Sequence, residues 1–326
     1  YDILLTIYDD FNIFIKILND FKLQKQILIN IGKFNKKLDN LKSDLYKFHP
    51  DITFLILDNR TIFEELFFDS SSLSTDELKK IVNEKANKLI QLIELFVTET
   101  NSYIVVSNLS IPYYTSYGIS ETKIEYGLKN MIQDFNTILE SSLKNTSSKH
   151  ILDINSFVLK FGEVNIFNYK QYFSGDIKIS FDYLPFLADE LLSFVKPFLG
   201  KNKKCIVLDL DNTLWGGVVG EDGFDGIKLG NTPSGKAFVE FQKYLLSLNK
   251  RGIILAVNSK NNIKDAMQVI QEHPNMILKE EHFATLQINW NDKISNMKEI
   301  ARELNIGLDS IVYFDDDEVN RELMRK

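Results

Sequence analysis

The sequence predicts an α/β protein made of two parallel-sheet domains. Short apolar runs alternate with segments of helical periodicity along the chain, which is typical of βα units stacked into a parallel sheet. After residue 200 the alternation becomes strict, and polar residues stand at the ends of three apolar runs. We therefore predict a doubly wound parallel sheet over residues 201–326 and a second α/β domain over residues 1–200.

Length and composition are those of a soluble, folded protein. The 326 residues correspond to roughly two domains. With 44% hydrophobic and 25% charged residues, the chain is neither collagen-like nor disordered. It has no apolar run long enough for a membrane span, and Asp9 and Asp10 follow its apolar start at once, unlike a signal peptide. We therefore expect no membrane partner.

Charge and cysteine content narrow the partners and the compartment. The formal net charge of −7 argues against a broad nucleic-acid-binding surface, so an anionic substrate has to be held by local groups. The single cysteine, Cys205, cannot form an internal disulfide. These features favour a reducing, cytoplasmic compartment and no nucleic-acid partner.

A short basic stretch, Gly200–Lys204, separates the two predicted domains. Before it, the clearest helix is Asp76–Thr98, which a capping box opens at Ser74. Because the sequence begins at Tyr1 without Met and stops within a helix-like pattern, we treat it as a piece of a longer chain, truncated at its C-terminus. The predicted N-terminal strands are Gln26–Ile31, Ile52–Leu57, Tyr103–Ser107 and Ile151–Ile154.

The C-terminal domain places polar residues directly after its strands. Ligands bind at the carboxyl ends of the strands in open α/β sheets, so this edge is the expected site. The predicted strands are Cys205–Leu208, Gly252–Val257 and Ser310–Phe314, and the predicted helices are Ser234–Leu248, Ile263–Gln271 and Ile294–Leu304.

Two carboxylates follow the first of these strands. Asp209 and Asp211 are two residues apart, so in an extended chain their side chains lie on the same side and can face one phosphate. Asp209 is the candidate nucleophile that would form an aspartyl-phosphate. Asp211 would then protonate the leaving oxygen and deprotonate the attacking water. Taken alone, such a pair is more often an acidic turn.

A second acidic group follows the last strand. Asp315 and Asp316 supply the oxygen ligands that Mg²⁺ prefers, and Mg²⁺ would neutralise the carboxylates that face the phosphate. Asp317 and Glu318 are better explained as the acidic first turn of a helix. Mg²⁺ is thus the cofactor that the sequence predicts.

The remaining candidates bind phosphate. Ser259 ends a strand, where its hydroxyl and the following amides can contact phosphoryl oxygens at a helix start. Lys293 is a candidate cation that offsets the charge on the phosphoryl group. Thr213 and Lys260 stand beside these motifs as further phosphate-binding candidates. Taken alone, Ser259 is better explained as a capping serine and Lys293 as a surface lysine.

The order of these motifs resembles the haloacid dehalogenase (HAD) superfamily of phosphatases, subfamily IIIC, which includes magnesium-dependent phosphatase-1 and the FkbH-like proteins. The resemblance rests on Asp209–Gly223, Ser259–Asn261, His273-Pro274, Asn289-Trp290 with Lys293, and Phe314–Asp316. It implies a HAD-like Rossmannoid fold. It also implies that Asp209 is the nucleophile, Asp211 the acid/base, and Ser259 and Lys293 the phosphate binders. Asp209, the Asp211 carbonyl and the Asp315-Asp316 pair would form the Mg²⁺ site, with Asp316 the more direct ligand.

The sequence departs from the FkbH-like pattern at two places. Asp317, Glu318 and Asn320 replace the usual Asn, Pro and Glu of the fourth motif. Members that load a glyceryl group from an acyl phosphate onto an acyl carrier protein use a thiol, often between the two motif aspartates, where this chain has Leu210. Cys205 is better explained as a buried core residue.

The C-terminal domain is expected to lack a cap. Only 20 residues separate Thr213 from Ser234 and 33 separate Ser259 from Lys293, too few for a lid domain. Gly216–Gly223 is predicted to form a turn and a short flap hairpin. An open site would accept a phosphorylated small molecule or a carrier-protein-linked substrate.

The N-terminal domain resembles the region that precedes the phosphatase domain in FkbH-like proteins, of the flavodoxin-like or SGNH-hydrolase type. Neither of its histidines has an Asp three residues before it, as an SGNH hydrolase requires, so we predict a noncatalytic docking domain. The leading hypothesis is a Mg²⁺-dependent phosphohydrolase. The alternatives are an FkbH-like glyceryl transferase/phosphatase that serves an acyl carrier protein, and a noncatalytic Mg²⁺-binding module.

Overall fold

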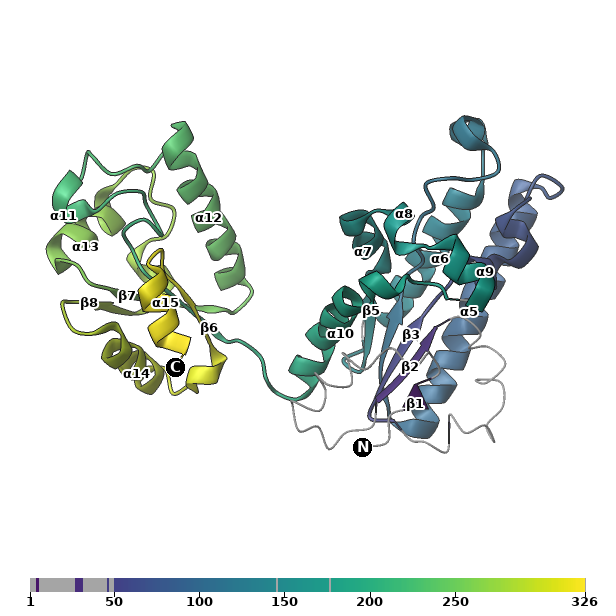
Figure 1. Ribbon diagram of the computed structural model, residues 1–326, viewed down its shortest axis with the longest axis horizontal. Coiled ribbons are helices and arrows are strands. Elements are labelled where there is room, and N and C mark those ends of the chain that lie inside the picture. Colours follow the sequence, from purple (N-terminus) through teal and green to yellow (C-terminus); the bar gives the residue numbers. More distant parts are fainter. Residues whose placement is uncertain are drawn as a thin grey trace. The chain divides into compact units, whose positions relative to one another are not determined.

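A computed structural model describes residues 50–144, 146–175 and 177–325, Tyr46, and the backbone of two short strands nearer the N-terminus. The chain forms two compact units that divide between Val195 and Lys196, a few residues before the basic stretch at Gly200–Lys204. Each unit contains its own parallel sheet (Figure 1).

The first unit has a five-stranded parallel sheet in chain order, β1-β2-β3-β4-β5. All its described strand pairs are parallel, so each connection must cross over the sheet. Its strands are β1 Leu4–Leu5, β2 Ile27–Ile31, β3 Ile52–Ile56, β4 Tyr103–Ser107 and β5 Lys149–Leu152. Its helices are α4 Asn59–Phe63, α5 Thr75–Thr100, α6 Leu128–Leu143, α7 Ile154–Phe161, α8 Glu163–Ile166, α9 Tyr169–Gly175 and α10 Leu184–Phe198.

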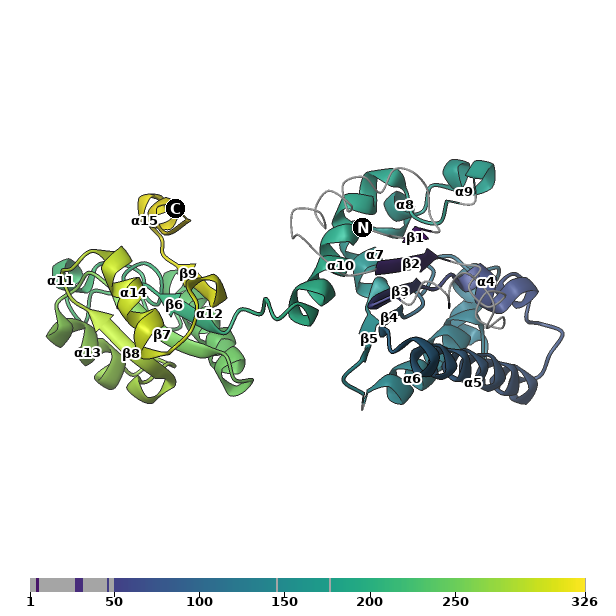
Figure 2. The same cartoon turned by 90° about the horizontal axis from the view of Figure 1, so that it is seen from below.

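Helices cover both faces of this sheet. Figure 2 shows α5 and α6 on one side and α7 and α10 on the other. Strand β3 is buried at every position, which is the pattern of a parallel strand covered on both faces. A core cluster joins Leu55 and Val106 to the apolar faces of α5 and α6, including Phe96 and Phe135.

The second unit has a four-stranded parallel sheet in the order β8-β7-β6-β9. Its strands are β6 Cys205–Leu208, β7 Ile254–Ser259, β8 Phe283–Ile288 and β9 Ile311–Phe314. Its helices are α11 Val219–Asp222, α12 Pro233–Lys250, α13 Ile263–Glu272, α14 Lys293–Glu303 and α15 Glu318–Arg325. This is the order 3-2-1-4 that begins a Rossmann sheet.

The core of the second unit is divided by the sheet. On one face Leu208 and Val257 pack with residues of α12 and α13, such as Leu245 and Val269. On the other face Val207 and Ala256 pack with residues of α14. Successive residues of β6 and β7 therefore serve opposite layers, as strand geometry requires. The predicted doubly wound α/β fold is confirmed.

Most predicted elements are present with small changes at their ends. The capping box at Ser74 starts α5, where Ser74 and Glu77 bond reciprocally. The run Ile151–Ile154 is shifted: β5 ends at Leu152, and Asp153 already caps α7 through the amide of Ser156. Gln26, the first residue predicted for β2, lies outside the described residues.

Two features of the second unit differ from the prediction. Strand β8 was not predicted, because it is an edge strand whose side chains are mostly half-buried or exposed and whose sequence mixes Thr285 and Gln287 with apolar residues. The flap Gly216–Gly223 contains the short helix α11, and its ladder is a single antiparallel bridge between Gly216 and Lys228.

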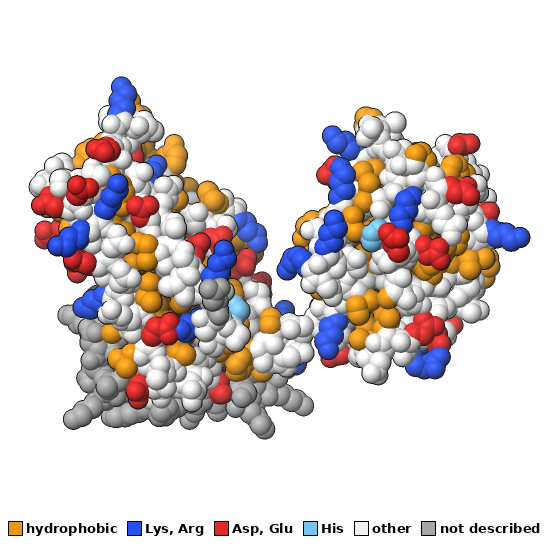
Figure 3. Space-filling view, turned by 180° about the vertical axis from the view of Figure 1, so that it is seen from behind, with side chains coloured by type: hydrophobic (Ala, Val, Ile, Leu, Met, Phe, Trp, Pro, Cys, Tyr) orange, Lys and Arg blue, Asp and Glu red, His pale blue; other side chains and the backbone are white. Residues whose placement is uncertain are grey.

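The surface carries mixed charges. Figure 3 shows acidic and basic side chains interspersed over the visible face of each unit. Among the described residues, none of the helices combines the length and apolar character that crossing a membrane requires.

Candidate active site

The candidate site lies at the switch point of the second sheet. Strand β6 comes first in the chain. Strands β7 and β8 follow on one side of it, and β9 then lies on the other side of β6. Asp209 follows β6 and Asp315 follows β9, and the amide of Asp209 bonds the carbonyl of Phe314 at 2.9 Å. Parallel neighbours that leave the sheet in opposite directions open a crevice at their carboxyl ends. The sheet order thus brings together acidic residues that are about a hundred positions apart.

Three carboxylates and one lysine form the centre of the site. Asp209, Asp315 and Asp316 each offer an oxygen within 4.8 Å of the others. The Nζ atom of Lys293 lies 2.8 Å from Oδ2 of Asp209 and 2.5 Å from Oδ2 of Asp315. Lys293, Asp209 and Asp315 are buried, whereas Asp316 is exposed. Lys293 therefore pairs with two of the three acidic side chains in this cluster.

The two neighbouring aspartates after β9 have different surroundings. Oδ2 of Asp315 accepts from Lys293 and from the hydroxyl of Tyr313, and Oδ1 accepts from the amide of Asp317 at 2.9 Å. The Asp316 carboxylate has no hydrogen bond or ion pair within the described part of the chain. Arg321 holds the backbone of both, donating to their carbonyl oxygens at 2.6 and 2.7 Å. Asp316 is thus the carboxylate with the most free ligand capacity.

Asp211 is held beside the cluster by three hydrogen bonds. Its Oδ1 accepts from Nε1 of Trp215 at 2.8 Å and from the amide of Val219 at 3.1 Å, and its Oδ2 accepts from Nδ2 of Asn261 at 2.8 Å. Its carboxylate is not among those that converge with Asp209. The backbone turns here through Asn212, whose φ of 53° lies in the left-handed region. Asp211 is therefore oriented by the flap and by the turn after β7.

An asparagine network that was not predicted from the sequence positions Lys293. Nδ2 of Asn258 donates to the Lys293 carbonyl at 2.8 Å. Nδ2 of Asn296 contacts Oδ1 of Asn258 at 3.2 Å and of Asn289 at 3.0 Å. Asn258 and Asn296 are buried, so these bonds satisfy amides that would otherwise be costly. The signal was present in the sequence as Asn residues at two strand ends and one turn into α14.

The predicted phosphate-binding residues lie in different environments. Ser259 is buried at the end of β7, and its hydroxyl works to lower the pKa of the neighbouring Asp209 carboxylate. Thr213 is half-buried in the turn after Asp209, with its amide donating to the Leu210 carbonyl at 3.1 Å. Lys260 is exposed. The structure therefore brings Ser259 and Lys293 against Asp209, while Lys260 has no contact of this kind among the described residues.

Electrostatics follow from burial and pairing. Burial raises the pKa of Asp209 above its ordinary value, and this outweighs the opposing effects of Lys293 and Ser259. Burial also raises the pKa of Asp211, against the bonds from Val219, Trp215 and Asn261. For Lys293, burial works to lower the pKa, but the two aspartates outweigh it and the pKa is raised. Lys293 thus stays charged at neutral pH.

Cys205 lies far from this chemistry along β6. Its side chain is fully buried in the core, at the opposite end of the strand from Asp209. Burial raises the pKa of its thiol to about 11, so little thiolate forms at neutral pH. These properties are those of a core cysteine.

The acidic cluster fits a hard divalent cation. Mg²⁺–oxygen bonds of about 2.1 Å put the ligand oxygens of one ion about 3 to 4 Å apart, close to the spacing that the three carboxylates already allow. The excess of carboxylates over lysine favours a cation. The three aspartates, with Asp316 as the least engaged, are the residues that could hold it.

The comparisons with known proteins identify the family. The profile described as "FkbH, N-terminal domain" matches residues 27–196, more than half of the chain. The chain belongs to the FkbH N-terminal domain family. This FkbH-family match lies on the first unit, where the motifs are sparse.

A solved structure extends the similarity of the FkbH-family chain to both units. It is the crystal structure of the N-terminal part of the protein BF1531 from Bacteroides fragilis, described as containing a phosphatase domain complexed with Mg. The two are 30% identical over 92% of this chain and 78% of that one, with a TM-score of 0.81. No curated protein matches the chain significantly.

Proposed function

We propose that this FkbH-family chain is a Mg²⁺-dependent phosphohydrolase that acts through an aspartyl-phosphate on Asp209. The observation that carries the proposal is the convergence of Asp209, Asp315 and Asp316 with Lys293 at one sheet edge. The Mg-complexed phosphatase domain of the similar protein supports it. When bound, Mg²⁺ would supply Lewis-acid stabilisation of phosphoryl charge.

In the first step a carboxylate oxygen of Asp209 attacks phosphorus, and the bond from phosphorus to the leaving oxygen breaks. Asp211 transfers its proton to that oxygen, so an alcohol departs and Asp209 carries the phosphoryl group. The raised pKa of Asp211 favours the protonated form that this step needs. Lys293 and the hydroxyl of Ser259 stabilise the negative charge beside the nucleophile.

In the second step Asp211, now a carboxylate, takes a proton from water while the water oxygen attacks phosphorus. The bond between Asp209 and phosphorus breaks, and inorganic phosphate leaves. Asp211 ends protonated and Asp209 ends as a carboxylate, so the cycle closes. The hydrogen bonds from Trp215 and Asn261 keep Asp211 aimed for both transfers.

The first test is hydrolysis of a generic aryl phosphate by the purified chain, with Mg²⁺ and with a chelator. We expect turnover with Mg²⁺ and none with the chelator. A panel of phosphorylated sugars, phosphorylated acids and phosphorylated carrier proteins then narrows the substrate. Absence of metal-dependent turnover on the whole panel would contradict the proposal.

Asp316→Asn should weaken Mg²⁺ binding by about tenfold or more, because it replaces the one carboxylate of the cluster that no described group engages. Isothermal titration calorimetry with MgCl₂ measures the change. Asp317→Asn is the matched control: it removes the same charge one residue later, and its side chain can still accept from the amide of Val319. Equal weakening by both variants would show that only net charge matters and that Asp316 is no ligand.

In Asn261→Asp, the part of the kcat–pH profile that the ionisation of Asp211 governs should move to higher pH, by on the order of one unit. A second carboxylate would replace the amide donor 2.8 Å from Oδ2 of Asp211 and would disfavour its ionised form, raising its pKa further. The dependence of kcat on pH measures the shift. Asn262→Asp is the control, since it adds the same charge in an exposed helix cap. An unchanged limb in Asn261→Asp would exclude Asp211 as the titrating group.

A further inference from the structure

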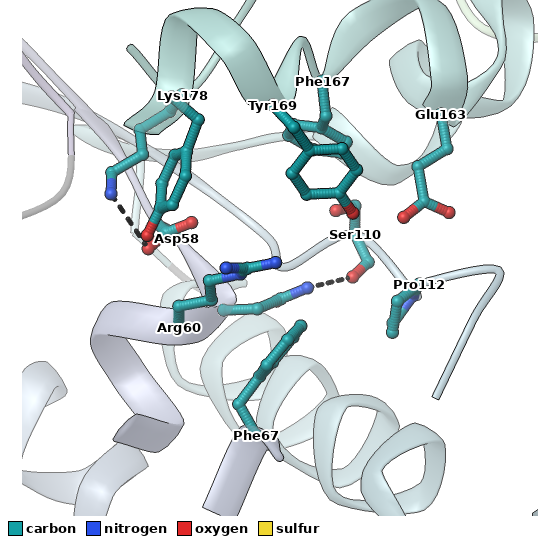
Figure 4. Close-up of a pocket in the computed structure, with 11 residues that line it drawn as sticks. Asp58, Arg60, Phe67, Ser110, Pro112, Glu163, Phe167, Tyr169 and Lys178 are labelled. Atoms are coloured by element: carbon teal, nitrogen blue, oxygen red, sulfur yellow. Dashed lines mark hydrogen bonds and ion pairs between the residues drawn. The ribbon is translucent and has the colours of Figure 1, made fainter. Parts of the chain in front are cut away.

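A cavity in the first unit lies at the carboxyl ends of β3 and β4 (Figure 4). Asp58, Asn59 and Arg60 follow β3, and Ser110 follows β4. Tyr169 and Lys178 face them from α9 and the segment after it. The cavity has a volume of about 60 Å³, counted as the space open to the centre of a water molecule. On that measure one water needs about 10–15 Å³. It can therefore hold a small molecule.

Two of its charges neutralise each other. The Nζ atom of Lys178 lies 3.7 Å from Oδ2 of Asp58, and both side chains are mostly buried. The same oxygen accepts from the amide and the hydroxyl of Thr61 at 3.0 and 2.8 Å, which starts α4. Lys178 also lies over the ring of Tyr172. This pair is engaged in holding the walls of the cavity.

Arg60 is a cation that pairs with no carboxylate in the part of the chain that the structure describes. Its guanidinium lies 5.1 Å from the ring centre of Phe67, 5.6 Å from that of Tyr169 and 5.0 Å from that of Tyr172. None of its N–H groups makes a hydrogen bond or ion pair with any described residue. The rings hold the guanidinium in place through cation–π contacts and leave the edge of its fork free. Such a fork matches a carboxylate in geometry and charge.

Asn59 provides an unused acceptor beside this cation. Its Nδ2 donates to the Ser110 carbonyl at 2.7 Å, which fixes the amide. Its Oδ1 is buried and has no hydrogen-bond partner among the described residues. A buried acceptor without a partner is costly to the fold, and a donor on a bound molecule would recover that cost. Glu163 on another wall is a second acceptor, already bonded by the amide of Tyr113 at 2.5 Å.

We propose that this cavity binds a small carboxylic acid with a hydroxyl or ammonium group next to its carboxylate. Arg60 receives the carboxylate, and Oδ1 of Asn59 accepts from the neighbouring donor. A monoanion fits better than a phosphate dianion. Among the described residues that line the cavity, Arg60 is the one cation outside an ion pair, and the acidic Glu163 is also on the wall. The site is separate from the phosphoryl chemistry of the second unit and does not depend on it.

The test is calorimetric titration of the intact chain, in chelator so that the acidic cluster holds no metal. The ligands are lactate, alanine, propionate, propane-1,2-diol and inorganic phosphate. We expect lactate or alanine to bind with a Kd of about 1–10 mM, as suits so few atoms. Propionate, which lacks the donor, should bind at least several-fold more weakly, and the diol should not bind. The lactate and alanine arms distinguish a hydroxy acid from an amino acid.

Variants connect the binding to the named groups. Arg60→Gln should weaken the bound acid at least tenfold, whereas Lys88→Gln, the same charge change at an exposed position of α5, should not. Asn59→Ala should abolish the preference over propionate; this second variant keeps the test decisive if Arg60→Gln fails to fold. The proposal is overturned if neither acid binds below about 30 mM, a limit set by the same size argument. The proposal is also overturned if inorganic phosphate binds more tightly than lactate and alanine, or if Arg60→Gln binds the acid with unchanged affinity.

Discussion

Asp209→Asn should reduce turnover of an aryl phosphate by about 10⁴-fold or more while the fold is retained. The amide has the same shape as the carboxylate and can still bond Lys293 or Ser259 in part, but it cannot attack phosphorus. Loss of a covalent nucleophile leaves only the binding and electrostatic contributions to the rate. Steady-state kinetics with Mg²⁺ measure the fall, and circular dichroism checks the fold.

The control for this variant is Asp309→Asn. It removes the same charge from an exposed position of the short 3-10 helix Leu308–Ser310, just before β9, and should leave turnover unchanged. If Asp209→Asn retained turnover within a few-fold of the unaltered chain, Asp209 would not be the nucleophile. Direct attack by water would then replace the covalent mechanism.

Lys293→Met should destabilise the metal-free chain by about 3 kcal/mol, the cost of removing one partner of a buried ion pair. Without the lysine, the buried carboxylates of Asp209 and Asp315 face each other with no cation between them. Added Mg²⁺ should stabilise the variant more than the unaltered chain, because the cation would neutralise the repulsion between the two carboxylates that the lysine no longer screens. Urea unfolding with and without Mg²⁺ measures both effects.

Lys298→Met is the matched control, since it makes the same change on the exposed face of the same helix, α14. It should alter the free energy of unfolding little and leave its Mg²⁺ dependence unchanged. If Mg²⁺ stabilised Lys293→Met and the unaltered chain equally, Lys293 would not be the group that balances the charge of the metal-binding carboxylates. Turnover should fall in Lys293→Met in either case, because the phosphoryl group loses its cation.

The fold was largely predictable because buried parallel strands form mostly apolar runs that end in polar residues. Strands β6 and β4 were located from such runs alone. The misses have different causes: β8 is an edge strand whose residues are mostly half-buried, and β5 gives way to the cap of α7 within one residue. Neither boundary leaves a clear apolar or turn signal.

The candidate site was predictable in composition but not in orientation. Motif order placed Asp209, Lys293 and Asp315 at one sheet edge, where the structure has them. Sequence could not show which oxygen bonds which donor. The roles of Tyr313 and Arg321 in holding the second acidic pair, and of Trp215 in aiming Asp211, depend on rotamers and turns. Periodicity carries no information on these.

The cavity around Arg60 was not predictable at all. Its aromatic walls come from Phe67 and from Tyr169 and Tyr172, about a hundred residues apart in the chain. Tyr169 lies opposite Arg60 and Phe67 across the cavity (Figure 4), so only the folding of the chain brings these rings together. Residue types that are unremarkable in isolation thereby form a defined environment.

The most direct test of the proposed mechanism is to trap the phosphoryl-enzyme. The chain is quenched with acid during turnover of an aryl phosphate with Mg²⁺, reduced with borohydride to convert an acyl phosphate into an alcohol, and digested for mass spectrometry. The mechanism predicts that Asp209, and not Asp211, Asp315 or Asp316, is converted to homoserine. Active turnover with an unmodified Asp209, or with the modification at another aspartate, would contradict it.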